Sequence, residues 1–368
     1  MKLKELEKLI QSGVESGAYP GATFAIVFKD MIYTNYVGNK ALYPSIEENS
    51  VDTIYDMASC SKVISTASGI LKLIETGKIR LFTKVADIIP EFIHKDLTVW
   101  NLVTHTSGLI ECVPNHANIK ESSEIWEKVM NADKPYESNQ HIKYSDLNFI
   151  LLGEIIKRVS GMPLDEFTKR EIFDKMEMHD TGYNPKDIKR CAPTEERNDL
   201  VVQGIVRGKV HDETAYTLGG VAGHAGLFST ARDTAKFIQM ILNDGMYKNT
   251  RVFPKCIIDM MYTPLVKEQV GLSVLPLQRS VGWIIKDYNP ASGDLVSNNT
   301  IQHTGFTGTN LWIDRDNEVG FCLLSNRVHP TRMNYKHMEL RPKVANYLIA
   351  NLDSIKEEIK KCKLNNLN

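Results

Sequence analysis

The stretch Tyr55-Asp-Met-Ala-Ser-Cys-Ser-Lys-Val-Ile-Ser65 decides how this chain of 368 residues is interpreted. It places Ser59 three residues before Lys62, and side chains at this spacing meet on one face of a helix. A serine hydroxyl holds its proton tightly and needs a base within hydrogen-bond reach before it can attack a carbonyl carbon. One such pattern is expected by chance in a chain of this length, so the motifs that follow carry the argument.

Two short motifs follow in order, Tyr144-Ser145-Asp146 and His303-Thr304-Gly305. Tyr144 precedes a strongly helical segment, which predicts that its phenol lies on a loop at a helix start. A phenol there can relay a proton if Lys62 lowers its pKa. Lys62 itself can act as the base only if burial or nearby cations lower its own pKa. The residues leave both alternatives open.

The third motif closes a predicted strand and offers groups for holding a substrate. Thr304 supplies a hydroxyl, and Gly305 has no side chain to keep a substrate away from the strand edge. The backbone N–H groups of Ser59 and Phe306 are the predicted donors to an oxyanion. His303 is predicted to contact the substrate or to act on it electrostatically.

Strand-like sequence lies near both ends of the chain, and helices and loops occupy the middle. Residues 22–28 and 31–37 predict two strands near the start, and residues 281–286, 300–303, 310–314 and 320–325 predict four more near the end. The pattern predicts an α/β fold of the α+β type, in which an antiparallel sheet is built from both chain ends and flanked by helices. Residues 1–80 and 270–368 are expected to form this domain, and residues 81–269 a mostly helical inserted domain with long loops.

The ordered set of three motifs resembles the serine β-lactamase and penicillin-binding protein superfamily. It is most similar to the class C-like branch, which also contains D-Ala-D-Ala peptidases, D-amino-acid peptidases and β-lactamase-like esterases. Residues 102–109, 218–230 and 281–283 are also similar to stretches of that branch. The resemblance implies the β-lactamase/transpeptidase-like fold and a covalent acyl-enzyme formed on Ser59.

Two residues depart from the pattern of that branch. Its second motif usually ends in Asn, whereas this chain has Asp146, and an ionised carboxylate there would hold Lys62 charged and shift the role of base to Tyr144. Its true β-lactamases begin the third motif with Lys, whereas this chain has His303. These departures favour peptidases and esterases over β-lactamases. The expected cytoplasmic location, away from cell-wall substrate, then ranks small esters or amides first, D-amino-acid peptides second and β-lactams third. A non-catalytic ligand-binding sensor is the alternative of another class.

Two further histidines, His211 and His224, lie outside the three motifs. His224 lies in a glycine-rich loop and is predicted to be structural, with a place in the cleft as the alternative. The neighbours His211 and Asp212 resemble half of a charge-relay pair, but the chain contains no Gly-x-Ser-x-Gly motif to support a hydrolase triad of that kind.

The bulk composition excludes several classes of function. The formal net charge of −1 gives no field that would attract nucleic acid, and no apolar run is long enough to cross a bilayer. The six cysteines are scattered without metal-ligand spacing, and there is no phosphate loop, dinucleotide fingerprint or zinc signature. We therefore expect no cofactor and no metal. The first residues do not read as a signal peptide, which predicts a cytoplasmic protein, or a periplasmic or extracellular one if a signal has been removed.

Overall fold

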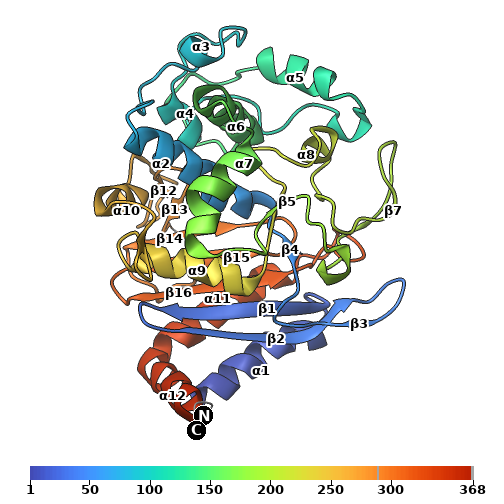
Figure 1. Cartoon of the computed structure of the whole chain (residues 1–368), viewed down its shortest axis with the longest axis vertical. Helices are drawn as coiled ribbons and strands as arrows, with labels where there is room; N and C mark the ends of the chain where they lie inside the picture. The colour runs from blue at the N-terminus through green and yellow to red at the C-terminus, as the bar shows by residue number, and fades with distance from the viewer. Residues whose placement is uncertain (288–289, 366–368) are drawn as a thin grey trace.

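Strands from both ends of the chain form the largest sheet. The computed structural model describes residues 1–287 and 290–365, and within them this sheet has nine strands, all paired antiparallel (Figure 1). Their order is β11 (Val266–Glu268), β12 (Leu277–Arg279), β13 (Ile284–Ile285), β14 (Thr300–Thr304), β15 (Asn310–Asp314), β16 (Val319–Ser325), β1 (Gly21–Phe28), β2 (Ile32–Ala41) and β3 (Glu47–Glu48).

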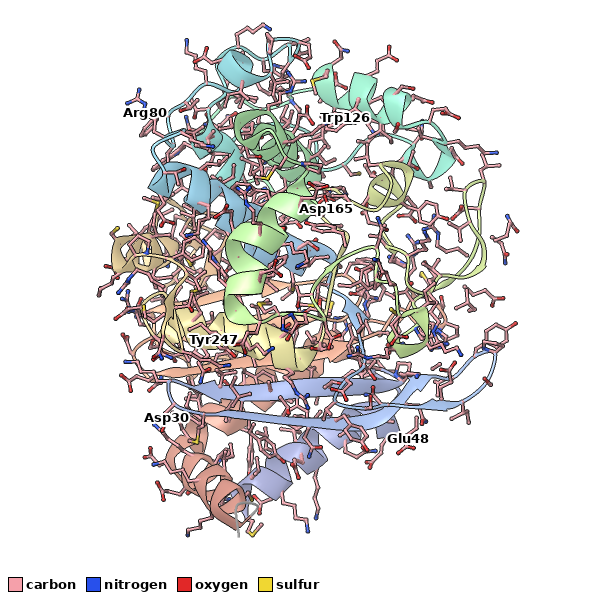
Figure 2. The ribbon with its side chains drawn as sticks, viewed as in Figure 1. Asp30, Glu48, Arg80, Trp126, Asp165 and Tyr247 are labelled. Atoms are coloured by element: carbon pink, nitrogen blue, oxygen red, sulfur yellow. The ribbon has the colours of Figure 1, made fainter. Side chains whose placement is uncertain are left out.

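Strand β1 divides two hydrophobic cores. Its side chains alternate between the faces of the sheet, so that Ala25 and Val27 enter one core while Phe24 and Ile26 enter the other. All of its residues are buried, which explains why its sequence is an almost continuous apolar run. The β1–β2 turn at Asp30 and the edge residue Glu48 lie at opposite ends of this part of the sheet (Figure 2).

Three helices from the two ends of the chain cover one face of the sheet, and they lie below it in Figure 1. Helix α1 buries Leu6 and Ile10 against that face. Helix α1 also packs against the two closing helices, and the apolar stripe that makes this possible has helical spacing. The three helices are α1 (Lys2–Glu15), α11 (His337–Ala350) and α12 (Leu352–Asn365).

The other face carries α9, which packs directly on β1 and β16, and above it a layer of helices (Figure 1). Helices α2, α6 and α7 pack against one another within that layer. The helices of this side are α2 (Ser68–Glu75), α3 (Val85–Ile88), α4 (Val99–Val103), α5 (Ser122–Met130), α6 (Asp146–Ser160), α7 (Leu164–Thr168), α8 (Glu213–Thr217), α9 (Ala231–Leu242) and α10 (Lys255–Tyr262).

Short strands complete the described part of the chain. A small sheet in the order β4-β8-β5 lies between the helical layer and the large sheet, and two hairpins stand apart from it. In the small sheet the amide of Met57 donates to the carbonyl of Leu227 at 2.9 Å, which joins the Ser59 segment to the glycine-rich loop. These strands are β4 (Tyr55–Asp56), β5 (Gly182–Tyr183), β6 (Glu196–Asn198), β7 (Gln203–Ile205), β8 (Leu227–Ser229), β9 (Met246–Tyr247) and β10 (Thr250–Arg251).

The predicted α+β architecture, with a sheet assembled from both chain ends, is confirmed. The division into domains at residues 80 and 270 stays a prediction. The strand expected over residues 281–286 is wrong in its extent, because only Ile284–Ile285 are paired as β13. Gly282 has a φ of +78° and donates its N–H to the Val103 carbonyl at 3.0 Å, so a buried turn replaces the first half of that strand.

The glycine-rich loop before β8 lies in direct contact with α6. A Cβ atom at Gly223 would overlap the carbonyl oxygen of Phe149 and would also lie 3.0 Å from the amide nitrogen of Gly153. Both neighbours are backbone atoms of a buried helix, which cannot turn aside as a flexible side chain can. The absence of a side chain at Gly223 therefore sets how closely this loop approaches α6.

Replacing Gly223 with alanine is expected to lower the free energy of unfolding by about 1–3 kcal/mol, because loop and helix must separate to make room for the methyl group. Chemical denaturation measures this loss. Gly182→Ala is the matched control, because a Cβ there meets no atom within 4 Å and its φ is not in the left-handed region. Equal stabilities of the two variants would contradict the packing argument.

Candidate active site

Ser59 lies in a short 3-10 turn, Ala58–Cys60, that leads through a π-helical segment, Lys62–Ala67, into α2. A 3-10 turn has about three residues per turn, so side chains three apart lie in line. The expected first turn of a helix is thus a tighter turn that carries Ser59, and Lys62 opens the π-helical segment that follows. Ala58 has a φ of +45°, a strained value for a residue with a side chain.

Asp56 holds this strained turn in place. Its carboxylate accepts hydrogen bonds from the amide of Ala58 at 2.8 Å and from the amide of His211 at 2.7 Å. Its carbonyl accepts a hydrogen bond from the Thr307 hydroxyl at 2.7 Å. Burial raises the pKa of Asp56 above its ordinary value, although the two amide hydrogen bonds oppose that change. Three distant segments of the chain therefore converge on the turn that carries Ser59.

Lys62 is completely buried beneath Ser59. Its Nζ donates to Ser59 Oγ at 3.0 Å and to the carbonyl of His224 at 2.8 Å, and it forms an ion pair with Asp146 Oδ1 at 2.7 Å. Burial alone would lower the pKa of Lys62, but the Asp146 carboxylate and the Tyr144 hydroxyl raise it by more, so that the pKa lies above its ordinary value. Lys62 is therefore an ammonium group in the resting site.

Tyr144 is the second side chain in contact with the nucleophile, and its ring centroid lies 4.9 Å from Lys62 Nζ. Its hydroxyl donates to Ser59 Oγ at 2.8 Å, and its ring stacks on the buried imidazole of His105 with 4.7 Å between the ring centroids. Although Tyr144 is 36% exposed, the desolvation of its buried part raises its pKa; the charge of Lys62 opposes this, and the charge of Asp146 adds to it. The net pKa lies above the ordinary value, so the expectation that Lys62 would pull it down is not met. Lys62 does act in that direction, but burial and the Asp146 carboxylate outweigh it.

The third motif comes from the end of β14 and lines the same cleft as Ser59 and Tyr144. The residues from this motif are His303, Thr304, Gly305 and Phe306. The His303 ring is buried, with Nδ1 at 3.0 Å from the carbonyl oxygen of Thr304. Burial and the charge of Lys62 lower the pKa of His303 to about 3, so its imidazole is neutral at neutral pH.

Gly305 has a structural reason to lack a side chain. A Cβ atom there would overlap the Thr309 hydroxyl and would lie 2.5 Å from the carbonyl oxygen of Met57. The amide of Gly305 donates to the carbonyl of Thr309 at 2.7 Å, which closes a tight loop after β14. This contact between the β14 loop and the Ser59 turn is a further reason for glycine, beside the approach of substrate on which the sequence prediction was based.

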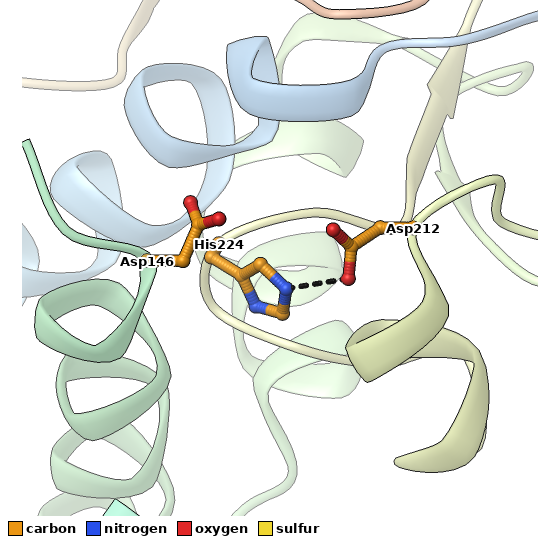
Figure 3. Close-up of side chains that lie close together, drawn as sticks. All are labelled: Asp146, Asp212 and His224. Carbon is orange, nitrogen blue, oxygen red and sulfur yellow. Dashed lines mark hydrogen bonds and ion pairs between the residues drawn. The ribbon is translucent and has the colours of Figure 1, made fainter. Parts of the chain in front are cut away.

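A second carboxylate and a histidine lie beside the Lys62–Asp146 pair (Figure 3). His224 Nε2 is 2.8 Å from Asp212 Oδ1, and the ring lies between Asp212 and Asp146. Burial alone would raise the pKa of Asp212, but His224 and Lys62 hold it well below its ordinary value. Sequence reasoning missed this arrangement. His211, its expected partner, instead lies 2.9 Å from Glu195 through Nε2.

Ligand atoms of Asp146, Asp212 and His224 lie within 4.8 Å of one another, a spacing that could suit a metal ion. The ammonium of Lys62, however, already occupies the cation position beside Asp146. Coulomb repulsion between that ammonium and a divalent ion in the same small space would oppose binding. We therefore interpret the cluster as a polar network beside Lys62, in which His224 is buried and both carboxylates are partly exposed.

Five residues of the cleft wall come from the segment after β16, which no sequence motif marks as part of a site. They lie in a loop and in the first turns of α11. They are Arg327, Tyr335, His337, Met338 and Arg341. A pattern search cannot find such residues, because they reach the cleft only after the two ends of the chain have come together in one sheet.

Comparison with known proteins agrees with this geometry. The family model described as Beta-lactamase matches residues 6–344. The "N-acetylmuramyl-L-alanine amidase" of Bacillus subtilis (strain 168) is 29% identical over 89% of this chain and 81% of its own length. The "Putative D-alanyl-D-alanine carboxypeptidase" of Escherichia coli (strain K12) is 28% identical over 89% of this chain and 83% of its own length.

A solved structure described as "EstCE1, a hydrolase with promiscuous acyltransferase activity" has the same fold. It superposes with a TM-score of 0.75 over 95% of this chain and 98% of its own, at 16% sequence identity. The fold, the order of the three motifs and the family match agree over nearly the whole chain. The protein belongs to the beta-lactamase family and is a serine hydrolase.

Proposed function

We propose that this protein cleaves small amides or esters through an acyl-enzyme formed on Ser59. The observation that carries the proposal is the pair of contacts at Ser59 Oγ, which receives hydrogen bonds from Lys62 Nζ at 3.0 Å and from the Tyr144 hydroxyl at 2.8 Å. A nucleophile with two proton-handling groups in contact is the arrangement that acyl transfer needs. Relatives named as an amidase and a carboxypeptidase support an amide as the bond cleaved.

Tyr144 is the proposed base. Lys62 is held as an ammonium by Asp146 and so has no free electron pair with which to accept a proton. Hydroxyl hydrogens rotate, and once Tyr144 is deprotonated, Ser59 donates to the phenolate. The oxygen of Ser59 then bonds to the acyl carbon, and the proton passes through Tyr144 to the leaving group as the bond to that group breaks. Water attacks the acyl-enzyme by the same route in reverse.

The backbone amides of Ser59 and Phe306 are the proposed donors to the oxyanion. Phe306 follows Gly305 in the tight loop that contacts the Ser59 turn, so both amides belong to segments fixed by the same hydrogen bonds. The amide dipoles are in place before charge develops, which is how such sites lower a barrier without reorganisation. Thr304, in the same cleft wall, offers a hydroxyl to the substrate.

Amides and esters rank ahead of β-lactams because of His303. Class C-like β-lactamases have a lysine at this position, whereas here the imidazole is neutral and supplies no positive charge to the cleft. Cleavage of D-amino-acid peptides ranks second, and the second relative's printed name supports it. A sensor that is acylated only once is the alternative of another class, and steady turnover separates it from an enzyme.

A reducing compartment is the proposed location. The cysteines Cys60, Cys112, Cys191, Cys256, Cys322 and Cys362 are all free. Free thiols persist where the cell keeps thiols reduced. Within the described residues no helix is long and apolar enough to cross a membrane.

Replacing Ser59 with alanine is expected to abolish turnover of p-nitrophenyl acetate and the acyl-enzyme seen by intact-protein mass spectrometry, because no other group can form the acyl bond. Thermal unfolding should show an unchanged fold. In the wild-type protein a burst should be followed by steady release of nitrophenol. Release that stops at one equivalent would favour the sensor, and full activity in the variant would remove Ser59 from the mechanism.

Tyr144→Phe removes the proposed base and keeps the ring that stacks on His105. We expect kcat to fall by about 10²–10⁴-fold, the usual contribution of general acid–base catalysis. Tyr335→Phe is the matched control, since Tyr335 lines the same cleft without contacting Ser59 through a hydrogen bond in the described structure. Similar rates for both variants would return the role of base to Lys62.

Asp146→Asn is expected to raise kcat/KM between pH 7 and pH 9. Tyr144 acts when deprotonated, and its pKa is raised in part by Asp146, so activity of the wild-type protein should still climb with pH through this range. Removing the carboxylate lowers the pKa of Tyr144, so the rising limb should move to lower pH, with about a tenfold gain for each pKa unit. The exposed carboxylate Asp353 supplies the control variant Asp353→Asn. If kcat/KM rises over the same pH range in Asp146→Asn as in the wild-type protein, Asp146 does not influence the pKa of Tyr144.

A further inference from the structure

Helix α4 ends in a turn at which glycine is the usual residue, but this chain has His105 there. The amide of His105 donates to the Leu102 carbonyl at 3.3 Å. The amide of Thr106 donates to the Asn101 carbonyl at 2.9 Å. These two bonds form the common helix ending in which one residue takes a left-handed backbone. His105 accordingly has a φ of +57°, which is unfavourable for a residue with a Cβ atom. The turn alone therefore gives no reason for a histidine.

The imidazole of His105 is buried and contacts the start of α6. Its Nδ1 atom accepts hydrogen bonds from the amide of Ser145 at 3.1 Å and from the side-chain amide of Asn148 at 3.2 Å. Burial lowers the pKa of His105 well below its ordinary value, and the charge of Arg279 adds to this. The ring is therefore neutral with its proton on Nε2, and Nδ1 keeps the lone pair that the two donors need.

His105 binds the chain on both sides of Tyr144. Its carbonyl accepts a hydrogen bond from the amide of Lys143 at 2.8 Å, and its Nδ1 accepts the bond from the amide of Ser145. Its ring also stacks on the ring of Tyr144, with 4.7 Å between the centroids and 29° between the planes. One residue therefore restrains the backbone before Tyr144, the backbone after it and the ring that carries the hydroxyl.

Tyr144 needs a restraint of this kind, because it is 36% exposed and borders the cleft. The proposed reaction requires its hydroxyl to stay within hydrogen-bond distance of Ser59 Oγ, where it lies at 2.8 Å. Displacement of a catalytic group by about 1 Å can lower a rate by about 100-fold. A ring packed against a buried neighbour is held in place before the substrate arrives.

We infer that His105 is the positioning residue for Tyr144, and that it keeps the phenolic oxygen beside Ser59 through the Ser145 amide and the stacked ring. The inference rests on the proposed role of Tyr144 as the base, and it adds to the site a residue outside the three motifs. In the described part of the chain His105 is not among the residues that line the cleft. Its effect on the reaction is therefore expected to pass through Tyr144.

Kinetics of His105→Asn test this inference. Asparagine tolerates a left-handed backbone, so the turn is kept while the stacked ring is lost. With p-nitrophenyl acetate as substrate, kcat should fall at least about tenfold, because the hydroxyl of Tyr144 loses its fixed position. KM should change by less than about twofold, because Tyr144 is proposed to act in the reaction and not in binding.

The same replacement in the Tyr144→Phe protein separates positioning from a general structural effect. Once the hydroxyl is absent, His105→Asn has nothing left to misplace, so kcat should change by less than about twofold. The effects of the two replacements are then non-additive, as expected for residues that act as a unit. A general structural effect would lower kcat equally in both backgrounds.

His329→Asn is the matched control. His329 is also buried, and its Nε2 accepts hydrogen bonds from the backbone amides of Leu42 at 3.1 Å and Tyr43 at 3.2 Å. It does not line the cleft in the described part of the chain. Its replacement should lower the temperature of thermal unfolding and leave kcat within about twofold of the wild-type value.

His105→Phe is the second variant, for the case in which His105→Asn does not fold. It keeps a ring beside Tyr144 and removes the acceptor for the Ser145 amide. We expect kcat to fall at least about fivefold, the net value of one hydrogen bond, and again only while Tyr144 carries its hydroxyl.

Two results would overturn the inference and leave Tyr144 as the base. One is a kcat within about twofold of the wild-type value in a folded His105 variant. The other is an equal loss of kcat in the wild-type and Tyr144→Phe backgrounds. Equal kcat in Tyr144→Phe and Tyr335→Phe would instead refute the proposed role of Tyr144 and, with it, the inference.

Discussion

The buried ammonium of Lys62 is the constraint around which the site is built. A charged amine with no solvent exposure is tolerated only when oxygen atoms surround it, and here they come from Ser59, Asp146 and the carbonyl of His224. These oxygens belong to a turn, to the start of α6 and to the glycine-rich loop. The three contacts of the Lys62 ammonium therefore fix the relative positions of three segments that are far apart in the sequence.

The ion pair between Lys62 and Asp146 also determines which group can act as the base. The ion pair that makes burial of Lys62 possible also keeps its proton in place, so Lys62 acts as a fixed positive charge next to Ser59 and Tyr144. A phenolate at Tyr144 would be stabilised by that charge, whereas the Asp146 carboxylate opposes its formation. The ionisation of Tyr144 is thus balanced between two groups of opposite sign, and a single carboxylate sets how much of the protein is ready to react at a given pH.

Sequence patterns predicted the fold class and the members of the three motifs because these depend on local information, such as strand alternation at 310–314 and the three-residue spacing from Ser59 to Lys62. Sequence patterns gave wrong or no predictions where contacts between distant segments determine the local structure. Gly282 replaces the start of a predicted strand with a turn, because its N–H donates to the Val103 carbonyl. The local pattern paired Asp212 with its neighbour His211, whereas the fold pairs it with His224. Arg341 carries no local signal, since α11 reaches the cleft only through the packing of the sheet. The order of the motifs was informative because the fold brings their segments together.

The surroundings of Lys62 and the third motif differ in the charge that they present to the cleft. The Lys62 ammonium is matched within the protein by the Asp146 carboxylate. In the third motif, the neutral imidazole of His303 adds no positive charge to the cleft. An enzyme that cleaves amides must protonate a poor leaving group. The Tyr144 hydroxyl, 2.8 Å from Ser59 Oγ, is the group placed to deliver that proton, so the balance of charge around Tyr144 acts on both the attack and the departure of the leaving group.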